Sequence, residues 1–271
     1  MVEGFLQCLT LLEDLSHLEV GGGMLPPTNL QKRFGAQEVL RGVNLDVPIG
    51  KITVVIGRSG TGKSVLLKIL MGLMRADEGQ ILIGGANITR FGDRELLKVR
   101  NRFGMVFQHS ALFDSMSVFE NVAFPLREHE RLRERELAAR VNAALASVGL
   151  VEHGHKDVHQ LSGGMRKRAA VARALVRKPE FLLYDEPTTG LDPIMTAHVD
   201  ELIRSTQDST PGLTSLVISH DMAATLRIAD KVAMLHEGAV IFEGTAEDLQ
   251  NTDHAAVRQF VEGRLDGPIH L

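Results

Sequence analysis

The chain has 271 residues, 44% of them hydrophobic and 24% charged, so it is long enough to bury a full core as one large domain or two small ones. Its net charge of −4 provides no general basic field, which argues against a nucleic-acid partner. The single cysteine, Cys8, excludes an internal disulfide, and no apolar run reaches the roughly 18 residues that a membrane-spanning helix needs.

The first segment, residues 1–27, is expected to be an extension that stands apart from the fold. From Phe5 to Leu18 apolar residues recur at helical spacing, but acidic residues replace the basic start of an export signal. A run of glycines, 21–23, breaks this pattern just before Met24. The segment is interpreted either as a tethered amphipathic helix or as a disordered stretch upstream of the true start, and the second interpretation is favoured.

Two strands are expected next, at Val39–Val47 and Ile52–Ile56. The second leads into Gly57-Arg58-Ser59-Gly60-Thr61-Gly62-Lys63-Ser64, which fits the P-loop pattern G-x-x-x-x-G-K-[ST]. In this pattern backbone N–H groups turn toward phosphates, the lysine reaches the β and γ oxygens, and the hydroxyl ligates Mg²⁺. An apolar helix that begins near Gly62 and includes Val65 adds its positive N-terminal end. The sequence therefore predicts a nucleoside triphosphate site.

The middle of the chain, from about Phe91 to Arg177, is expected to be mostly helical and inserted into a sheet-based core. Short strands are expected at Ile81–Ile83 and Phe103–Phe107. From Glu130 to Val148 apolar residues recur near helical spacing, so one face of that helix should meet water. A second amphipathic helix follows the run Leu161-Ser162-Gly163-Gly164-Met165 and carries several arginines.

Strands are expected to return at Phe181–Tyr184, Ser215–Ser219 and Val232–Leu235. Asp185 and Glu186 end the first of these, an arrangement typical of a Walker B element, in which the first acid holds Mg²⁺ and the second lies beside the attacking water. Taken alone, such a pair is weak evidence, because strands often end in carboxylates. The alternation of strands with helices favours an α/β fold.

The P-loop, the 161–165 run, the two acids and the downstream Ser219-His220-Asp221 occur in an order that resembles the ATP-binding-cassette (ABC) ATPases over about Leu30 to Gly244. The resemblance implies an α/β P-loop NTPase fold with a RecA-like core, an antiparallel β subdomain and an inserted helical subdomain at about 91–177. The ATPase domain would cover 28–246. A helical tail at 247–271, with a small helix at Ala255–Gly263, would follow.

The resemblance also implies roles for single residues. Glu186 would activate water, His220 would donate to the γ-phosphate, and Lys63 and Gln108 complete the catalytic set. Mg²⁺ would be held by Ser64, Asp185 and Gln108. Phe34 would stack on adenine where the family more often has tyrosine; the less favoured alternative is a core phenylalanine.

A second subunit is implied at each site. In this family two domains pack head to tail, so Ser162, Gly163 and Gly164 of one subunit would contact the γ-phosphate held by the other. Met165 stands where the family usually has glutamine, which affects only the fifth contact of this run. Asp192 would lie in the D-loop against the other subunit, although an Asp-Pro pair is also an ordinary helix start.

The resemblance leaves three classes of ABC protein: a transporter subunit, a soluble ATPase of DNA repair or chromosome maintenance, and a two-cassette translation factor. A single P-loop argues against the translation factors. Only about a hundred residues separate Lys63 from Ser162, which leaves no room for the long coiled coil of the repair ATPases. The expected protein is therefore an ATP hydrolase coupled to transport, peripheral on the cytoplasmic face of the inner membrane.

A finer likeness covers Gln108 to His129, with support from Leu161–Arg168 and Asp192-Pro193-Ile194. It resembles the ATPase of Mla-type, or Mce-associated, phospholipid transport systems. This implies ATP and Mg²⁺ as cofactors, and as partners a second ATPase subunit, a permease dimer and an Mce-type lipid-binding protein. The alternative cargo is a small polar solute. The segment Leu112–Phe124 is expected to help receive the permease, although its apolar residues could also be internal core.

Overall fold

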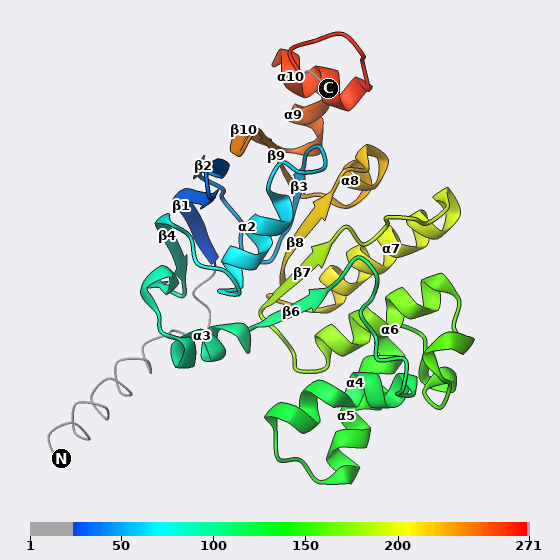
Figure 1. Ribbon diagram of the computed structural model, residues 1–271. Coiled ribbons are helices and arrows are strands. Elements are labelled where there is room, and N and C mark those ends of the chain that lie inside the picture. Colours follow the sequence, from blue (N-terminus) through cyan, green and yellow to red (C-terminus); the bar gives the residue numbers. More distant parts are fainter. Residues whose placement is uncertain (1–23, 270–271) are drawn as a thin grey trace, which may run out of the picture.

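The structure is a computed structural model that describes residues 24–269, and the expectations for residues 1–23 lie outside this range. Its elements form two sheets flanked by helices (Figure 1). One sheet is four-stranded, with the order β2-β1-β4-β5. Its strands are β1 (Met24–Phe34), β2 (Gln37–Val43), β4 (Glu78–Ile83) and β5 (Ala86–Asn87).

β1 extends the fold into the range expected for the extension. Met24 pairs with Ile83 and Leu25 with Leu82, both antiparallel, so residues 24–27 belong to the first sheet rather than to the 1–27 segment. The sequence does not predict this strand, because its polar residues and its two successive prolines hide the period-two pattern. Register shifts at Leu25/Thr28 and Thr28/Gln31 interrupt its pairing with β4.

The second sheet is six-stranded, with the order β10-β9-β3-β8-β7-β6, and forms the centre of the molecule. β9, β3, β8, β7 and β6 are parallel, and β10 runs antiparallel to β9. Its strands are β3 (Ile52–Ile56), β6 (Phe103–Val106), β7 (Phe181–Asp185), β8 (Thr214–Ser219), β9 (Lys231–His236) and β10 (Ala239–Gly244). The carboxyl ends of its parallel strands therefore meet at one edge.

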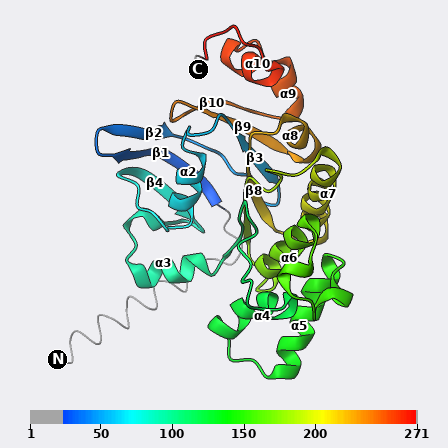
Figure 2. The ribbon, with the colours of Figure 1, turned by 45° about the vertical axis from the view of Figure 1, so that its right-hand side comes forward.

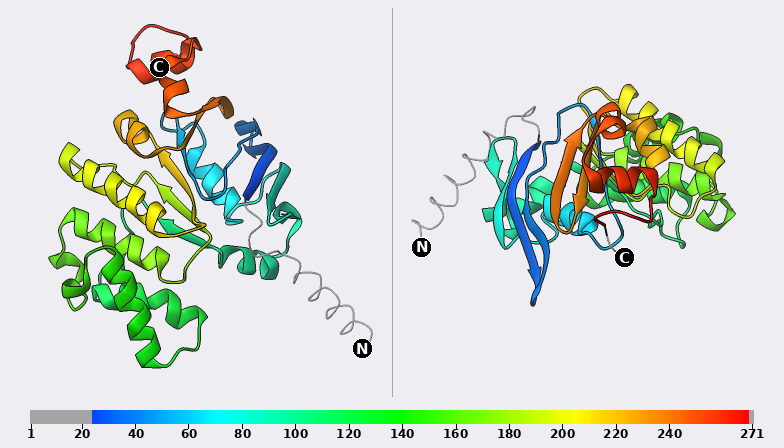
Figure 3. Two further views of the ribbon diagram at one scale, coloured as in Figure 1. Left: turned by 180° about the vertical axis from the view of Figure 1, so that it is seen from behind. Right: turned by 90° about the horizontal axis from the view of Figure 1, so that it is seen from above.

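The helices pack around these sheets. They are α2 (Lys63–Leu70), α3 (Asp93–Arg100), α4 (Val118–His129), α5 (Glu134–Ser147), α6 (Gly163–Leu175), α7 (Pro193–Ser209), α8 (Met222–Ile228), α9 (Ala246–Asn251) and α10 (Ala255–Glu262). Short 3₁₀ turns are η1 (Ile88–Arg90), η2 (Val151–His153) and η3 (Val158–Gln160). Figure 2 and Figure 3 show the antiparallel sheet on one side of the central sheet and α6 and α7 on the other.

Two hydrophobic cores lie on the two faces of the central sheet, because side chains alternate along a strand. In β3, Ile52, Val54 and Ile56 pack into the core with the helices α4 to α7. Val55 packs into the other core, together with α2 and the antiparallel sheet. The sheet thus joins a helical layer to a β layer.

The expected helical insertion at about 91–177 contains elements of both layers. Leu96 and Val99 of α3 and Phe103 of β6 pack into the core of the β layer. The helices that pack on one another are α4, α5 and α6, and they gather at one end of the molecule (Figure 1). The helical region proper therefore lies after β6, within 118–175.

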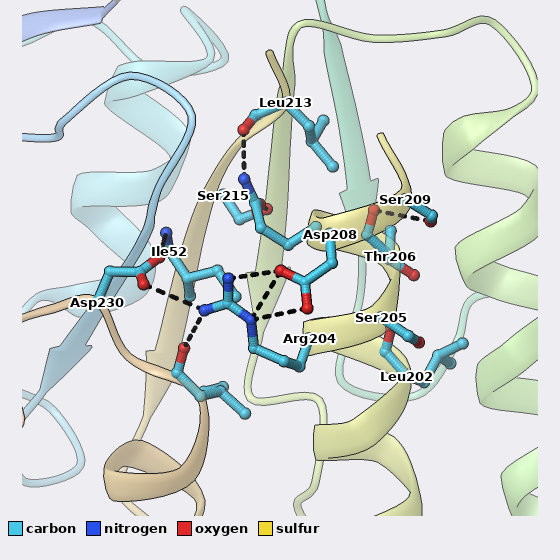
Figure 4. A network of polar contacts seen from close by, with 12 residues as sticks. Ile52, Leu202, Arg204, Ser205, Thr206, Asp208, Ser209, Leu213, Ser215 and Asp230 are labelled. Carbon is cyan, nitrogen blue, oxygen red and sulfur yellow. Dashed lines mark hydrogen bonds and ion pairs between the residues drawn. The ribbon is translucent and has the colours of Figure 1, made fainter. Parts of the chain in front are cut away.

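A polar network fixes α7 against the amino-terminal edge of the central sheet (Figure 4). Arg204 on α7 pairs with Asp208 at 2.7 Å and with Asp230 at 3.1 Å. The second carboxylate oxygen of Asp230 accepts from the N–H of Ile52, the first residue of β3, at 2.8 Å. This network lies at the opposite end of β3 from the P-loop, so it anchors the sheet without entering the site.

Candidate functional site

The P-loop, Asp185, Glu186 and His220 lie at the carboxyl edge of the central sheet. Ile56, which precedes the P-loop, is in register with Ser219, which precedes His220. Asp185 is in register with Ile218 on the other side of β8. Because these strands are parallel neighbours, the P-loop, the two acids and the histidine converge from three strand ends.

The P-loop, residues 57–64, depends on glycine at defined positions. Gly57, Gly60 and Gly62 have φ values of 151°, 82° and 102°, where side-chain-bearing residues are strained. A Cβ added at Gly57 would collide with the Leu235 carbonyl oxygen, and one at Gly62 would lie 2.9 Å from the Leu40 side chain. Gly62 is also the N-cap of α2, so the loop leads directly into a helix N-terminus.

Lys63 is 4% exposed and its ammonium group lies inside the P-loop. Its Nζ donates to the carbonyl oxygens of Gly57 at 2.8 Å and Arg58 at 2.9 Å. Burial lowers the pKa of Lys63, and the charges of Glu186 and Asp185 oppose that shift. The ammonium group therefore lies in the loop where phosphate oxygens would replace the two carbonyls.

Ser64 and Asp185 provide adjacent oxygens. Ser64 Oγ donates to Asp185 Oδ1 at 3.2 Å, and burial raises the pKa of Asp185 despite this hydrogen bond. Within residues 24–269, no three His, Cys, Asp or Glu side chains gather as a metal site made of protein alone. One hydroxyl and one carboxylate fit Mg²⁺, which is usually held by few protein oxygens together with substrate phosphates.

Glu186 adopts a left-handed backbone conformation with a φ of 46°, which is uncommon for a residue with a side chain. Its carboxylate Oε2 accepts from Thr189 Oγ1 at 2.9 Å and lies 3.5 Å from His220 Nδ1. The imidazole of His220 is half exposed, whereas the Glu186 carboxylate is 19% exposed. The carboxylate is therefore held in one direction at the mouth of the site.

Gln108 follows β6 and is half-buried, as expected for a residue at the edge of the sheet. Its backbone carbonyl accepts from Lys167 Nζ on α6. Phe34 ends β1 and is 46% exposed, and Lys32 Nζ lies 5.6 Å from its ring centroid. An exposed ring can stack on a base, which a buried core phenylalanine could not.

The run 162–164 begins α6. Ser162 is exposed, and its Oγ caps the helix by accepting from the Met165 N–H at 3.3 Å. Asp192 caps α7, because its Oδ1 accepts from the N–H groups of Ile194 and Met195 at 3.0 Å. Helix α6 packs on α4, α5, α7 and β6, whereas the P-loop joins β3 to α2. These two halves of the expected site therefore belong to different parts of the chain.

Three residues near the site were not singled out from the sequence. Thr189 contacts Glu186, and Lys167 contacts Gln108. Arg173 contacts Ser110 and Ala111. Thr189 stands three residues after Glu186, in a turn that its N–H closes onto the Glu186 carbonyl, so turn spacing could have identified it. The contact of Lys167 spans 59 positions and leaves no local pattern.

Comparison with known proteins gives consistent matches. Residues 40–189 match the model of the family described as ABC transporter. The chain is 43% identical over 242 residues to the probable ribonucleotide transport ATP-binding protein mkl of Mycobacterium leprae, covering 89% of this chain and 70% of that one. It is 42% identical over 243 residues to the intermembrane phospholipid transport system ATP-binding protein MlaF of Haemophilus influenzae, covering 90% and 92%.

A solved structure shares the fold. The dimeric post-hydrolysis state of the ATP-binding cassette MJ0796, bound to ADP and Pi, has a TM-score of 0.72 and 29% identity, covering 82% of this chain and 98% of that chain. No helix within residues 24–269 combines the length and apolar character needed to cross a membrane.

Proposed function

Because the chain belongs to the ABC transporter family and is an ATP-hydrolysing transporter subunit, we propose that it powers phospholipid transport between membranes of the cell envelope. The observation that carries this proposal is the 42% identity to the phospholipid transport protein MlaF over 92% of that chain. Its partners would be a permease dimer and an Mce-type lipid-binding protein. It would lie on the cytoplasmic face of the inner membrane.

The site geometry supports roles for the residues around the triphosphate. Lys63 would exchange the Gly57 and Arg58 carbonyls for β and γ oxygens and neutralise their charge. Ser64 and Asp185, with Gln108, would hold Mg²⁺, whose charge would stabilise the negative oxygens of the transferred phosphoryl group. Residues 57–65 would surround the phosphates and Phe34 would stack on adenine.

Glu186 and His220 lie where the attacking water would approach. The Glu186 carboxylate, fixed by Thr189, would orient the water or remove its proton. His220, with its ring half exposed, would donate to the γ-phosphate. These contributions consist of positioning and charge stabilisation, which is how phosphoryl transfer is usually catalysed.

The second subunit would complete the site. ABC ATPase domains form dimers, as the MJ0796 structures illustrate. Exposed Ser162, with Gly163 and Gly164, stands at a helix N-terminus, where N–H groups and the helix dipole attract an anion. In a head-to-tail dimer these residues, and Asp192 beside them, would close over the triphosphate of the partner.

The segment Leu112–Phe124 would help receive the permease. Phe113 in this segment is 42% exposed, and Phe107 just before it is 41% exposed, so both present apolar surface. Val118 and Val122 on α4 are fully buried and belong to the core, as the alternative interpretation of this segment expects for its apolar residues. The docking surface would therefore consist of the loop before α4 rather than of the helix interior.

A small polar solute is the second candidate cargo. It rests on the 43% identity to mkl of Mycobacterium leprae, whose name refers to ribonucleotide transport. Transport of either cargo would be powered by the same ATPase site, because other chains of a transporter recognise the cargo.

Cargo can be identified by purifying the protein with its native membrane partners and analysing the bound small molecules by mass spectrometry. Copurified phospholipid, released when ATP is added, is the expected result. A tightly held nucleotide, sugar or amino acid, with no lipid above the level found in an unrelated membrane complex, would favour the second candidate and contradict the first.

The role of Glu186 is tested by Glu186→Gln, which removes the base and keeps the size. We expect hydrolysis to fall at least about a hundredfold, as for loss of a general base, while ATP binding persists. Unhydrolysed ATP should then hold two subunits together, visible as a dimer in size-exclusion chromatography. Unchanged turnover, measured as phosphate release, would refute the assignment.

A further inference from the structure

The loop that carries Gln108 is attached to helix α6 by two cationic side chains. Lys167 Nζ donates to the carbonyl oxygen of Gln108. Arg173 donates from Nη1 to the Ala111 carbonyl at 2.6 Å and from Nη2 to the Ser110 carbonyl at 2.9 Å. Three of the four carbonyls in residues 108–111 thus accept from one helix. Each of these hydrogen bonds spans about sixty positions of the chain.

Lys167, which makes the first of these contacts, is buried, with 5% of its surface exposed. In the part of the chain that the structure describes, no carboxylate forms an ion pair with it, so a backbone carbonyl is its polar partner. Burial lowers the pKa of Lys167, which reflects the cost of placing an ammonium group there. An apolar side chain of the same length would avoid this cost, so stability alone does not account for a lysine at this position.

The loop itself is strained at the residues that Arg173 contacts. Ser110 and Ala111 both have left-handed backbones, with φ values of 63° and 47°. For residues other than glycine such a conformation is energetically unfavourable, and it persists only when surrounding contacts hold it. The guanidinium of Arg173 donates to these same two residues. The two strained residues are therefore the same two whose carbonyl groups Arg173 holds.

We propose that Lys167 and Arg173 are positioning residues that clamp the 108–111 loop to α6 and hold Gln108 in the geometry that hydrolysis requires. This inference rests on the role of Gln108 in the proposed function. The N-terminus of α6 carries Ser162 to Gly164, so the clamp joins the loop beside one triphosphate to the helix that closes the site of the partner. Gln108 and Ser162 then move as one unit when the helical layer shifts.

The clamp is tested on the full-length protein with Lys167→Met, which keeps the length of the side chain and removes its donor. We expect kcat for ATP hydrolysis to fall roughly ten- to hundredfold, because a small misplacement of a positioning group has effects of that size. The Kd for ATP should stay within about twofold of wild type, because Lys63 and the P-loop are untouched. Thermal stability should change little, because the burial cost of the ammonium group disappears while the Gln108 carbonyl loses its donor.

Two further variants make the test specific. Lys167→Arg keeps a cation and is expected to recover most of the lost kcat. Arg177→Met removes a cation just beyond the end of α6 that pairs with Glu130 rather than with the loop, so it should leave kcat near that of wild type. A kcat within about twofold of wild type in Lys167→Met would overturn the clamp.

The clamp would also be overturned if ATP affinity and melting temperature fell together with kcat in both Lys167 variants, because that pattern marks a purely structural role. Neither result depends on the cargo, since hydrolysis by the isolated subunit is measured. The lipid assignment fails separately, when purified transporter carries no phospholipid.

Discussion

At the scale of single residues, Glu186 combines an uncommon backbone conformation with a fixed side chain. Its φ of 46° turns the chain immediately after β7, and the turn brings Thr189 back to its carboxylate. Strained residues cluster at functional sites when the surrounding structure holds them. Here the holding contact is the hydrogen bond from Thr189. The direction of the Glu186 carboxylate is therefore set by its backbone conformation and by Thr189 together.

Thr189→Val is expected to lower kcat for ATP hydrolysis about tenfold, because it keeps the shape of the side chain and removes the donor to Glu186. The Kd for ATP should not change, since the P-loop is unaffected. Thr189→Ser keeps the hydroxyl and serves as the matched control. Steady-state phosphate release with nucleotide titration checks both values, and equal rates for the valine and serine variants would contradict the role.

The raised pKa of Asp185 makes the stability of the nucleotide-free protein depend on pH. Burial raises its pKa above the ordinary 3.8, and the nearby Glu186 charge adds to this although the Ser64 hydrogen bond opposes it. A carboxyl whose pKa is higher in the folded chain stabilises the fold below the unfolded pKa, and that contribution is lost as pH rises through the folded pKa. At neutral pH the ionised group therefore destabilises the nucleotide-free protein.

Asp185→Asn is accordingly expected to raise the melting temperature of the nucleotide-free protein at neutral pH, with a gain that shrinks as the pH falls toward 3.8. The same variant should lose the extra stabilisation that ATP with Mg²⁺ gives the wild type, because one of the metal ligands is neutralised. Thermal unfolding with and without nucleotide, at several pH values, measures both effects. A lower melting temperature without nucleotide would show that the charge is stabilised in place.

Part of the site could be predicted from the sequence because its chemistry is local. The P-loop residues and the pair Asp185-Glu186 each form a contiguous pattern set by phosphate and metal geometry. Lys167 and Arg173 could not be found that way, since their partners become neighbours only when α6 packs beside β6. The left-handed backbones of Ser110 and Ala111 likewise leave no signal in residue type.

At the scale of elements, the buried side chain of Asn121 connects α4 to the loop before it. Its Oδ1 accepts from the Phe113 N–H at 2.8 Å, and its Nδ2 donates to the Phe113 and Ser117 carbonyls at 3.0 Å. The residue is fully buried, so the loop that would receive the permease is fixed from inside the protein. Phe113 is thereby held with its ring partly exposed, against Phe124 at a centroid distance of 4.9 Å.

Asn121→Ala is expected to cost about 3 kcal/mol of stability, because several buried polar groups lose their partners at once. For a protein of this size that corresponds to a melting temperature lower by about 5–10 °C. Ser117→Ala removes only the N-cap of the same helix and should cost about 1 kcal/mol. Denaturant unfolding of both variants checks the ranking, and an alanine at 121 no more harmful than one at 117 would contradict it.

Which elements could be predicted follows from how they are buried. α5 can be predicted because Leu137, Val141 and Leu145 face one core at helical spacing. β3 can be predicted because all five of its residues are buried. β1 and β10 cannot, because β1 has two successive prolines near its start and β10 has no fully buried position, so neither shows a clean pattern. Their place in a sheet is decided by pairing with distant strands.

For the molecule as a whole, the proposed function implies that each subunit carries two halves of a site that only a dimer would complete. The P-loop, Asp185, Glu186 and His220 converge at one edge of the central sheet, while Ser162 caps a helix of the helical layer. Residues of the 108–111 loop connect the two through Lys167 and Arg173. A dimer with head-to-tail packing would complete both sites, each with one half from each subunit.

The most direct test of this account mixes two inactive variants, Lys63→Ala and Ser162→Arg, and measures ATP hydrolysis. Each variant alone spoils both shared sites and should be inactive. In a mixed dimer, one site combines both defects and the other is intact. We expect mixing to recover up to about a quarter of the wild-type rate, because half of the dimers are mixed and each of these has one working site of two. No recovery, although cross-linking shows that mixed dimers form, would contradict it.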